Sequence, residues 1–324
     1  MILGWPLKVV VKHLPLVDFL VFYSWLFFLT NIIAWNCRGA RKPAFKNHVR
    51  ELVRIHDPAI LIVMETRVGG VRAKEITDEL LFDRAIHTDT IGFTGGLWLL
   101  WNEDRVDISQ LANTEQEIHV IVKVRCSNLN WLLSAIYASP RCADRQVLWS
   151  NLKMMAEVHE MPWVMAGDFN EPLMEDDKFG GRGLSVSRAL QFKECLDACS
   201  MIDIGFSGPR FTWTNRREVQ ALIQERIDRF FVNSQWCLMY PEARVVHLTR
   251  CHSDHAPILL ELQPRFHENR RKLFKFQTCW LSNCTFPSVV THAWGQCTGL
   301  VQAIEAFSKE ATRWNKEQFG NVFL

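Results

Sequence analysis

Short apolar runs recur along this sequence, and polar or glycine residues follow most of them. Runs of this kind are typical of buried strands, and segments with apolar residues at helical spacing lie between several of them. The alternation predicts an α/β fold in which two sheets pack face to face and helices cover both outer faces. Helices are expected over 43–56, 73–81, 140–155 and 187–198. Strands are expected over 32–35, 60–64, 95–101, 106–111, 118–124, 131–137, 163–166, 211–215, 226–232, 243–248 and 258–262.

The run 163–166 is followed by the most informative polar residues of the chain. Gly167 ends the run, and Asp168 and Asn170 then stand two positions apart. Residues i and i+2 of an extended backbone point to the same face, so a carboxylate and a carboxamide leave a buried strand together. Asp168 could accept a proton from water, and Asn170 could donate hydrogen bonds to a charged oxygen. An ordinary strand-exit turn is the alternative interpretation of these residues.

Polar residues end other apolar runs in the same way, and this recurrence predicts one shared site. Strand ends on one side of a sheet are where loops assemble functional groups on a rigid frame. Taken singly, each residue has a structural alternative, such as a turn, a helix cap, a surface ion pair or a core histidine. The residues are Asn36, Glu65, Tyr137, Asp168, Asn170, Asp228, Asp254 and His255.

The chemistry of three of these residues is complementary. Glu65 offers the hard oxygen that Mg²⁺ prefers. His255, next to a buried carboxylate, would be held in one orientation and stabilised as an imidazolium that could bind a phosphoryl oxygen. Asp168 is then free to take a proton from attacking water. A metal ion, a cation and an oriented base together predict cleavage of a phosphodiester.

Composition limits the remaining possibilities. A chain of 324 residues can bury a large core, and its formal charge of +2 means that a nucleic-acid surface would have to be a local patch. The ten cysteines form no C-x-x-C motif and are interpreted as reduced thiols of an intracellular protein. One group contains the right residue types for zinc, but its spacing and its interleaved aromatic residues favour packing. That group is Cys279, Cys284, His292 and Cys297.

Two changes in composition divide the chain into three parts. Residues 1–30 form an apolar N-terminal extension, and the run 14–30 has a membrane anchor or signal sequence as an alternative interpretation. The steady alternation of strands and helices fills residues 31–264. Residues 265–324 begin with several basic side chains and continue as an amphipathic, helical tail.

The motifs, taken together and in order, resemble the endonuclease/exonuclease/phosphatase superfamily, and in detail the apurinic-type endonuclease domain of plant LINE (non-LTR) retrotransposons. The resemblance spans about 31–264 and implies a DNase I-like four-layer sandwich of two mixed sheets. The tail resembles the linker that precedes a reverse transcriptase. The motifs are 35–39 (Trp-Asn-Cys-Arg-Gly), 65–66 (Glu-Thr), 136–137 (Ile-Tyr), 167–170 (Gly-Asp-Phe-Asn), 211–213 (Phe-Thr-Trp), 226–229 (Arg-Ile-Asp-Arg) and 253–255 (Ser-Asp-His).

The resemblance assigns roles to the residues of the site. It implies that Glu65 is a ligand of Mg²⁺ or Mn²⁺, that Asn36 binds beside it, and that Asp254 lies next to the metal. For catalysis it implies that Asp168 activates water, that Asn170 positions it, and that Tyr137 touches the scissile phosphate. It further implies that Asp228 orients His255.

DNA contacts are expected on one side of this site. The resemblance associates Thr212 with the DNA backbone. Four arginines near the Thr212 strand or in the glycine-rich loop are candidate phosphate contacts, with solvated surface as the alternative for each. They are Arg182, Arg210, Arg216 and Arg217.

The expected function is that of a Mg²⁺-dependent endonuclease that nicks one DNA strand and leaves a 3′-hydroxyl. Apurinic repair enzymes usually carry a carboxylate where this chain has Arg38, and this departure favours the retrotransposon branch. The expected partners are DNA and, in a full-length element, a reverse transcriptase, with no other protein partner and a nuclear location. The alternatives are a superfamily phosphatase acting on inositol phosphates or lipids, and an inactive nucleic-acid-binding remnant of an element.

Overall fold

The computed structural model describes residues 30–88, 90, 95–127, 129–263, 280, 283, 285–295 and 299–319. The chain divides into two compact units, 1–265 and 266–324. In the part that is described, no helix combines the length and the apolar character needed to cross a bilayer. The expected anchor over 14–30, except for Thr30, and the three cysteines of the considered zinc group lie outside the described residues.

The first sheet of the larger unit has six strands in the order β14-β15-β1-β2-β4-β3. Its centre is the parallel pair β1 (Ile32–Asn36) and β2 (Ile60–Met64), which helix α2 (Pro43–His56) connects. All of the residues in these two strands are buried, as expected for strands covered on both faces. The flanking antiparallel strands are β3 (Arg84–His87), β4 (Leu97–Trp101), β14 (Arg244–His247) and β15 (Ile258–Glu261).

The second sheet also has six strands, in the order β10-β13-β8-β7-β6-β5. Its centre is the parallel pair β7 (Asn130–Tyr137) and β8 (Trp163–Asp168), which helix α4 (Cys142–Val158) connects. The flanking antiparallel strands are β5 (Val106–Asn113), β6 (Glu117–Val124), β10 (Met201–Asp203) and β13 (Asp228–Asn233).

Three apolar clusters build four layers. The largest joins alternate residues of both sheets, such as Ile62 and Leu99 from one and Leu133 and Val164 from the other, so the sheets pack face to face. A second cluster lies between the first sheet and helices α2 and α3 (Gly70–Thr77), and a third between the second sheet and helices α4 and α5 (Val186–Ala198). The expected four-layer α/β sandwich is confirmed. Each aliphatic side chain that it buries fully contributes roughly 1.5–3 kcal/mol.

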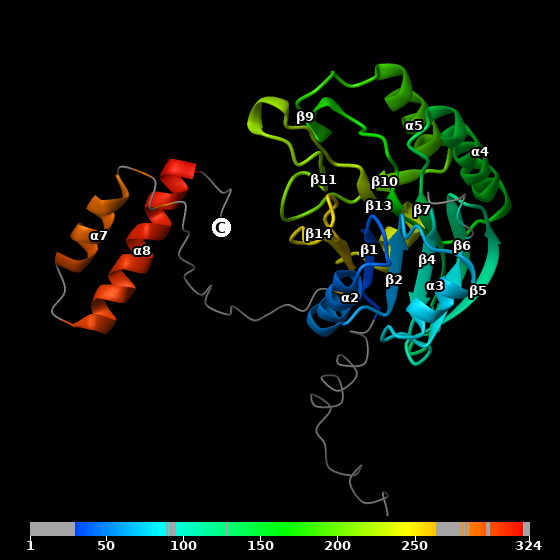
Figure 1. Ribbon diagram of the computed structural model, residues 1–324, viewed down its shortest axis with the longest axis horizontal. Helices are drawn as coiled ribbons and strands as arrows, with labels where there is room; N and C mark the ends of the chain where they lie inside the picture. The colour runs from blue at the N-terminus through cyan, green and yellow to red at the C-terminus, as the bar shows by residue number, and fades with distance from the viewer. Residues whose placement is uncertain are drawn as a thin grey trace, which may run out of the picture. The chain divides into compact units, whose positions relative to one another are not determined.

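The two sheets have the same internal plan. The segment β2-α3-β3-β4 of the first sheet matches β8-α5-β10-β13 of the second, in both chain order and sheet order. Strands β14, β15 and β1 of the first sheet likewise occupy the places of β5, β6 and β7 in the second. The two central parallel pairs, β1–β2 and β7–β8, face each other across the core (Figure 1).

A small third sheet extends from the carboxyl end of β8. Its order is β11 (Trp213–Thr214), β12 (Gln224–Glu225), β9 (Lys178–Phe179), and short 3₁₀ turns at Glu175–Asp177 and Val219–Ala221 accompany it. The strand expected over 211–215 is therefore much shorter than predicted, and the one expected from 226 begins at Asp228. Helix α6 (Ser234–Met239) follows β13, and the Asn233 side chain caps it by accepting a hydrogen bond from the Trp236 backbone N–H.

The smaller unit contains two helices, α7 (Phe286–Gly295) and α8 (Leu300–Phe319). Trp280, Phe286, Ala311 and Trp314 form a small core of its own. The Trp280 indole N–H donates to the Asn315 side chain at 2.8 Å, so the polar edge of this core is satisfied.

Candidate active site

The central strands of both sheets end at the same place and bring the predicted polar residues together. Asn36 ends β1 and donates through Nδ2 to Asp168 Oδ2 at 2.9 Å and to Glu65 Oε2 at 3.2 Å. Asp168 ends β8, directly opposite Asp228 at the start of β13. One carboxamide therefore links two carboxylates that come from different sheets, and the candidate site lies across the end of the sandwich.

Gly167 is required by the backbone that presents Asp168. It has a φ of +146°, and a Cβ atom at this position would lie 1.9 Å from the Ile136 carbonyl oxygen. Only glycine lets β8 approach β7 so closely. The Asp168 backbone N–H then donates to the Met64 sulfur of the other sheet at 3.0 Å. The end of β8 is thus fixed from both sides.

Asp168 is completely buried, and this burial changes its acidity. Burial, followed by the charge of Asp228, raises the pKa of Asp168 to about 7, although His255 and the Asn36 hydrogen bond oppose the shift. A carboxylate with a pKa near neutrality can accept a proton far better than an ordinary aspartate. Asp168 therefore has the properties of a general base.

His255 is buried and held by one strong partner. Its Nδ1 lies 2.9 and 3.2 Å from the two Asp228 oxygens and 3.9 Å from Asp168 Oδ2. Burial alone would lower the pKa of His255, but the charges of Asp228 and Asp168 outweigh it and raise the pKa to about 9. The ring is therefore an imidazolium at neutral pH, with its Nε2–H left for an anionic group.

Asn170 and Tyr137 border the same carboxylate. Asn170 has a φ of +49°, a left-handed conformation that asparagine tolerates, and its backbone N–H donates to Asp168 Oδ1 at 2.9 Å. Its Nδ2 donates to the Ala138 carbonyl at 2.8 Å, which holds the loop that follows β7. Burial, followed by the charges of Glu65 and Asp168, raises the pKa of Tyr137, so its hydroxyl remains a hydrogen-bond donor.

Glu65 and Asp254 supply the carboxylates at the open end of the site. Both side chains are 13% exposed, whereas Asp168 and Asp228 are inaccessible. Together with the Asn36 amide oxygen they offer only hard oxygen donors, the set that suits Mg²⁺ or Mn²⁺ rather than zinc. The donor chemistry fits a divalent ion. Asp168, Asp228 and His255 form a second group whose ligand atoms lie within 4.8 Å of one another.

Arg226 and Arg229, the neighbours of Asp228, do not pair with it. Arg229 is 1% exposed and contacts Asp177 and Asp203, and Arg226 donates to Asp203 at 2.7 and 2.8 Å. The charges of these arginines and aspartates neutralise one another. The surface ion pair considered for Asp228 is therefore absent among the described residues, and its carboxylate is committed to His255.

Thr212 lies in the interior, next to the elements that carry Asp228 and His255. It is completely buried, and its Oγ1 accepts hydrogen bonds from the backbone N–H groups of Ile227 at 3.2 Å and Asp228 at 3.1 Å. Its carbonyl oxygen accepts from the Ala256 N–H at 2.7 Å. A side chain without exposed surface cannot touch a DNA backbone in this conformation. Thr212 instead fixes the two loops that carry Asp228 and His255.

The four predicted phosphate-binding arginines are all exposed. Arg210 lies 3.2 Å from the Asp176 carboxylate and over the Phe211 ring, and Arg216 donates to the Ser253 carbonyl. Arg182 lies in the glycine-rich loop and Arg217 follows β11. Of these, only Arg216 contacts a loop of the site through a hydrogen bond that the structure gives.

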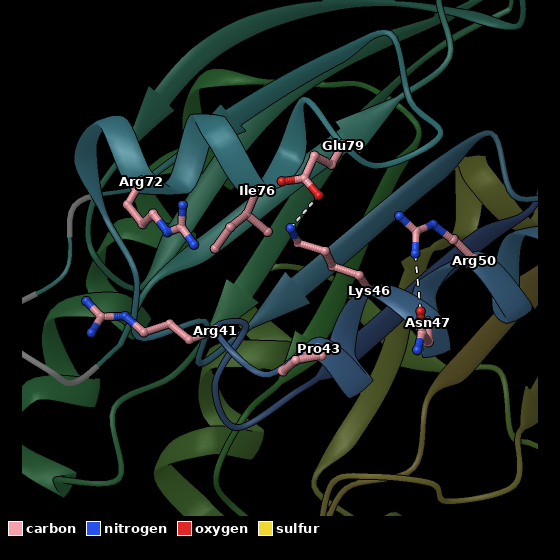
Figure 2. A pocket seen from close by; sticks show the side chains of 8 residues that line it. All are labelled: Arg41, Pro43, Lys46, Asn47, Arg50, Arg72, Ile76 and Glu79. Carbon is pink, nitrogen blue, oxygen red and sulfur yellow. Dashed lines mark hydrogen bonds and ion pairs between the residues drawn. The ribbon is translucent and has the colours of Figure 1, made fainter.

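Sequence reasoning missed a basic hollow among the residues of helices α2 and α3. It measures about 330 Å³, and Figure 2 shows it between helices α2 and α3. Lys46 pairs with Glu79 and Arg50 with Asn47, and the pKa of Glu79 is lowered, first by the Lys46 hydrogen bond. The sequence feature that could have indicated it is the recurrence of basic residues around α2, at Arg41, Lys46 and Arg50. The lining residues are Arg41, Pro43, Lys46, Asn47, Arg50, Arg72, Ile76 and Glu79.

Comparisons with known proteins give one family match and several similar folds. The family profile described as "Endonuclease/Exonuclease/phosphatase family" matches residues 33–255. No curated protein sequence matches the chain.

Three solved structures illustrate the likeness in fold. The endonuclease domain of TRAS1, a telomere-specific non-LTR retrotransposon, has a TM-score of 0.55 at 16% identity, covering 73% of this chain and 99% of that one. The AP endonuclease LMAP from Leishmania major has a TM-score of 0.58 at 16% identity, covering 71% and 86%. The 3′-5′ exonuclease from Neisseria meningitidis has a TM-score of 0.54 at 18% identity, covering 72% and 100%.

Proposed function

The chain belongs to the endonuclease/exonuclease/phosphatase family, and from this membership we propose that it is a divalent-metal-dependent endonuclease that nicks one strand of DNA. The observation that carries the proposal is the buried Asp168–Asp228–His255 group, which Asn36 links to Glu65. It combines a base, a fixed cation and hard oxygen donors at one strand end. These are the three elements that hydrolysis of a phosphodiester requires.

The proposed steps begin with water. Asp168, with its pKa raised to about 7, takes the proton of the attacking water, and Asn170 holds the loop against which that water lies. His255 presents an imidazolium to a non-bridging phosphate oxygen, and Asp228 keeps the ring in one orientation. Tyr137 donates its hydroxyl to the same phosphate. Mg²⁺ or Mn²⁺, when bound by Glu65, Asp254 and Asn36, supplies Lewis-acid stabilisation of the developing charge.

DNA is the substrate that the surroundings favour. Arg41, Lys46, Arg50 and Arg72 line a hollow that begins three residues after Arg38 and contains a single carboxylate, Glu79. Such a group suits the regularly spaced phosphates of a nucleic-acid strand and would bind them in a salt-dependent way without reading sequence. We also propose four exposed arginines as additional phosphate contacts. They are Arg182, Arg210, Arg216 and Arg217.

The finer identity also belongs to this proposal. Arg38 replaces the carboxylate expected of apurinic repair enzymes, and the fold is similar to a non-LTR retrotransposon endonuclease. We therefore propose an origin in a plant LINE element, with residues 31–264 as the endonuclease domain and 265–324 as a link toward a reverse transcriptase. A nuclear location follows from that role.

The test is nicking of supercoiled plasmid by the full-length chain in Mg²⁺. Asp168→Asn and His255→Gln should each reduce the nicking rate by at least about 10²-fold, and EDTA should abolish it. Arg84→Gln is the control, because Arg84 is an exposed residue on edge strand β3 that pairs with Glu103. An unnicked plasmid with well-folded protein would refute the proposal, and release of phosphate from inositol phosphates would then identify a phosphatase.

A further inference from the structure

Both carboxylates at the open end of the site are held by arginines. Arg38 contacts Asp254 through Nη1 and lies 3.6 Å from Glu65 Oε1 through Nε. Arg67 donates to Glu65 Oε1 from Nε at 3.1 Å and from Nη2. The two arginine side chains are 44% and 41% exposed, so they lie over the site from the solvent side.

The carboxylate oxygens have few free lone pairs in this state. Glu65 Oε2 accepts from Asn36, and Oε1 accepts from Arg67. Asp254 Oδ2 accepts from Arg38 and from the Trp213 indole N–H at 3.0 Å. A divalent ion binds carboxylate oxygens directly at about 2 Å. An ion that binds Glu65 Oε1 or Asp254 Oδ2, the oxygens that the arginines contact, would displace a guanidinium, so the ion and the arginines compete for the same two carboxylates.

Arg38 and Arg67 differ in how easily a divalent ion could displace their side chains from the carboxylates. Arg67 makes two hydrogen bonds to a single oxygen of Glu65. Arg38 bridges two carboxylates that both belong to the proposed metal site, and one of its two contacts is long. Its backbone is fixed, because the Gly39 and Ala40 N–H groups donate to the carbonyls of Glu65 and Thr66 at 2.9 Å. Displacement would therefore move only the Arg38 side chain.

The charges in the site give the released side chain a destination. Four carboxylates (Glu65, Asp168, Asp228 and Asp254) contact three cations (Arg38, Arg67 and His255), which leaves one negative charge among these seven groups when Asp168 is ionised. A divalent ion reverses this excess, and one phosphodiester would neutralise it. A guanidinium that has lost its carboxylates is a strong ligand for a phosphate oxygen.

Resting on the proposed function, we propose that Arg38 is a phosphate-binding residue for the nucleic-acid substrate that divalent-ion binding releases. Without the ion, Arg38 is held by Glu65 and Asp254. With the ion, those carboxylates bind the metal and Arg38 binds a phosphate of the strand. Metal and DNA therefore strengthen each other's binding through this side chain, and the coupling is reciprocal.

The first measurement is the affinity for Mn²⁺ without DNA, by calorimetry and by loss of the free-ion EPR signal. Arg38→Gln removes the competing guanidinium and should tighten Mn²⁺ binding roughly three- to tenfold, the range expected for losing two partly exposed ion pairs. The matched control is Arg84→Gln, which removes the same charge from β3 and should change the affinity less than twofold. An affinity for Arg38→Gln that is unchanged or weaker would overturn the proposal.

The second measurement is the coupling between metal and DNA. Fluorescence anisotropy would give the Kd of a 20-base-pair duplex with and without Mn²⁺, with Asp168→Asn present in every protein to prevent cleavage. Mn²⁺ should strengthen DNA binding at least threefold more when Arg38 is present than in Arg38→Gln. Equal strengthening would show that Arg38 does not pass to the phosphate.

The outcomes separate this inference from the proposed function. Coupling through Arg38 in a protein that fails to nick plasmid would support the inference and refute the nuclease. Nicking by the unaltered chain, with no coupling through Arg38, would support the nuclease and refute the inference.

Discussion

Replacement of Thr212 by valine tests how the site is held together. Valine has nearly the shape of threonine, but it cannot accept the hydrogen bonds that Ile227 and Asp228 donate at 3.2 and 3.1 Å. Each buried N–H that loses its partner costs about 1–3 kcal/mol. Thr212→Val should therefore lower the free energy of unfolding by roughly 2–6 kcal/mol, with a fall in Tm of about 2–4 °C for each kcal/mol.

The measurement is urea denaturation followed by tryptophan fluorescence, with nicking measured on the same protein. Thr212→Ser keeps the hydroxyl and serves as the control, with a smaller loss that comes from one missing methyl group. If Thr212 were a DNA contact instead, Thr212→Val would keep its stability and lose DNA affinity. Unchanged stability of the valine variant would refute the internal role that we assign to the hydroxyl.

Three other predictions follow from the site. The nicking rate should rise with pH as Asp168 loses its proton near pH 7, and it should fall as His255 loses its proton near pH 9. A series of rates measured against pH with its maximum outside these limits would contradict the assigned roles. Gly167→Ala places a methyl group against the Ile136 carbonyl and should cost more than about 3 kcal/mol of stability, measured by thermal unfolding against Gly183→Ala, whose Cβ meets nothing within 4 Å. Arg229→Met removes the buried guanidinium that contacts both Asp177 and Asp203 and leaves them only Arg226, so it should cost about 3–5 kcal/mol, whereas a change below 1 kcal/mol in urea denaturation would show that the Arg229 pairs are dispensable.

The fold was predictable because its central strands are covered on both faces. Continuous apolar runs such as 60–64 and 163–166 can be recognised without knowledge of their neighbours. Helix α2 was predicted from Pro43 to His56 because a proline at its first position and a regular apolar stripe mark it. Edge strands such as β3 were missed, since its residues are only partly buried and show no alternation.

The candidate site was predictable only as a collection of strand ends. The hydrogen bond from Asn36 to Asp168 joins residues 132 positions apart, and the contact of Arg38 with Asp254 spans 216. No local pattern encodes such pairs. The internal role of Thr212 was missed for a related reason, because a hydroxyl that accepts from the backbone sixteen residues later resembles any other threonine in the sequence.

The pairing of β1 with β15 determines where the polypeptide enters and leaves the larger unit. Ile32 lies opposite Leu260, so the first and last strands run side by side and their outer ends are neighbours. Asn36 marks the end of β1 at the candidate site, and Ile32 is therefore at the opposite end of the strand, roughly 13 Å away at the rise of a strand. Both described ends of the larger unit therefore lie at the end of the sheet opposite Asn36. The same closeness of ends makes the unit suitable for circular permutation: a short linker from 261 to 32, with new termini at the turn 102–105 between β4 and β5, would keep every strand in its sheet.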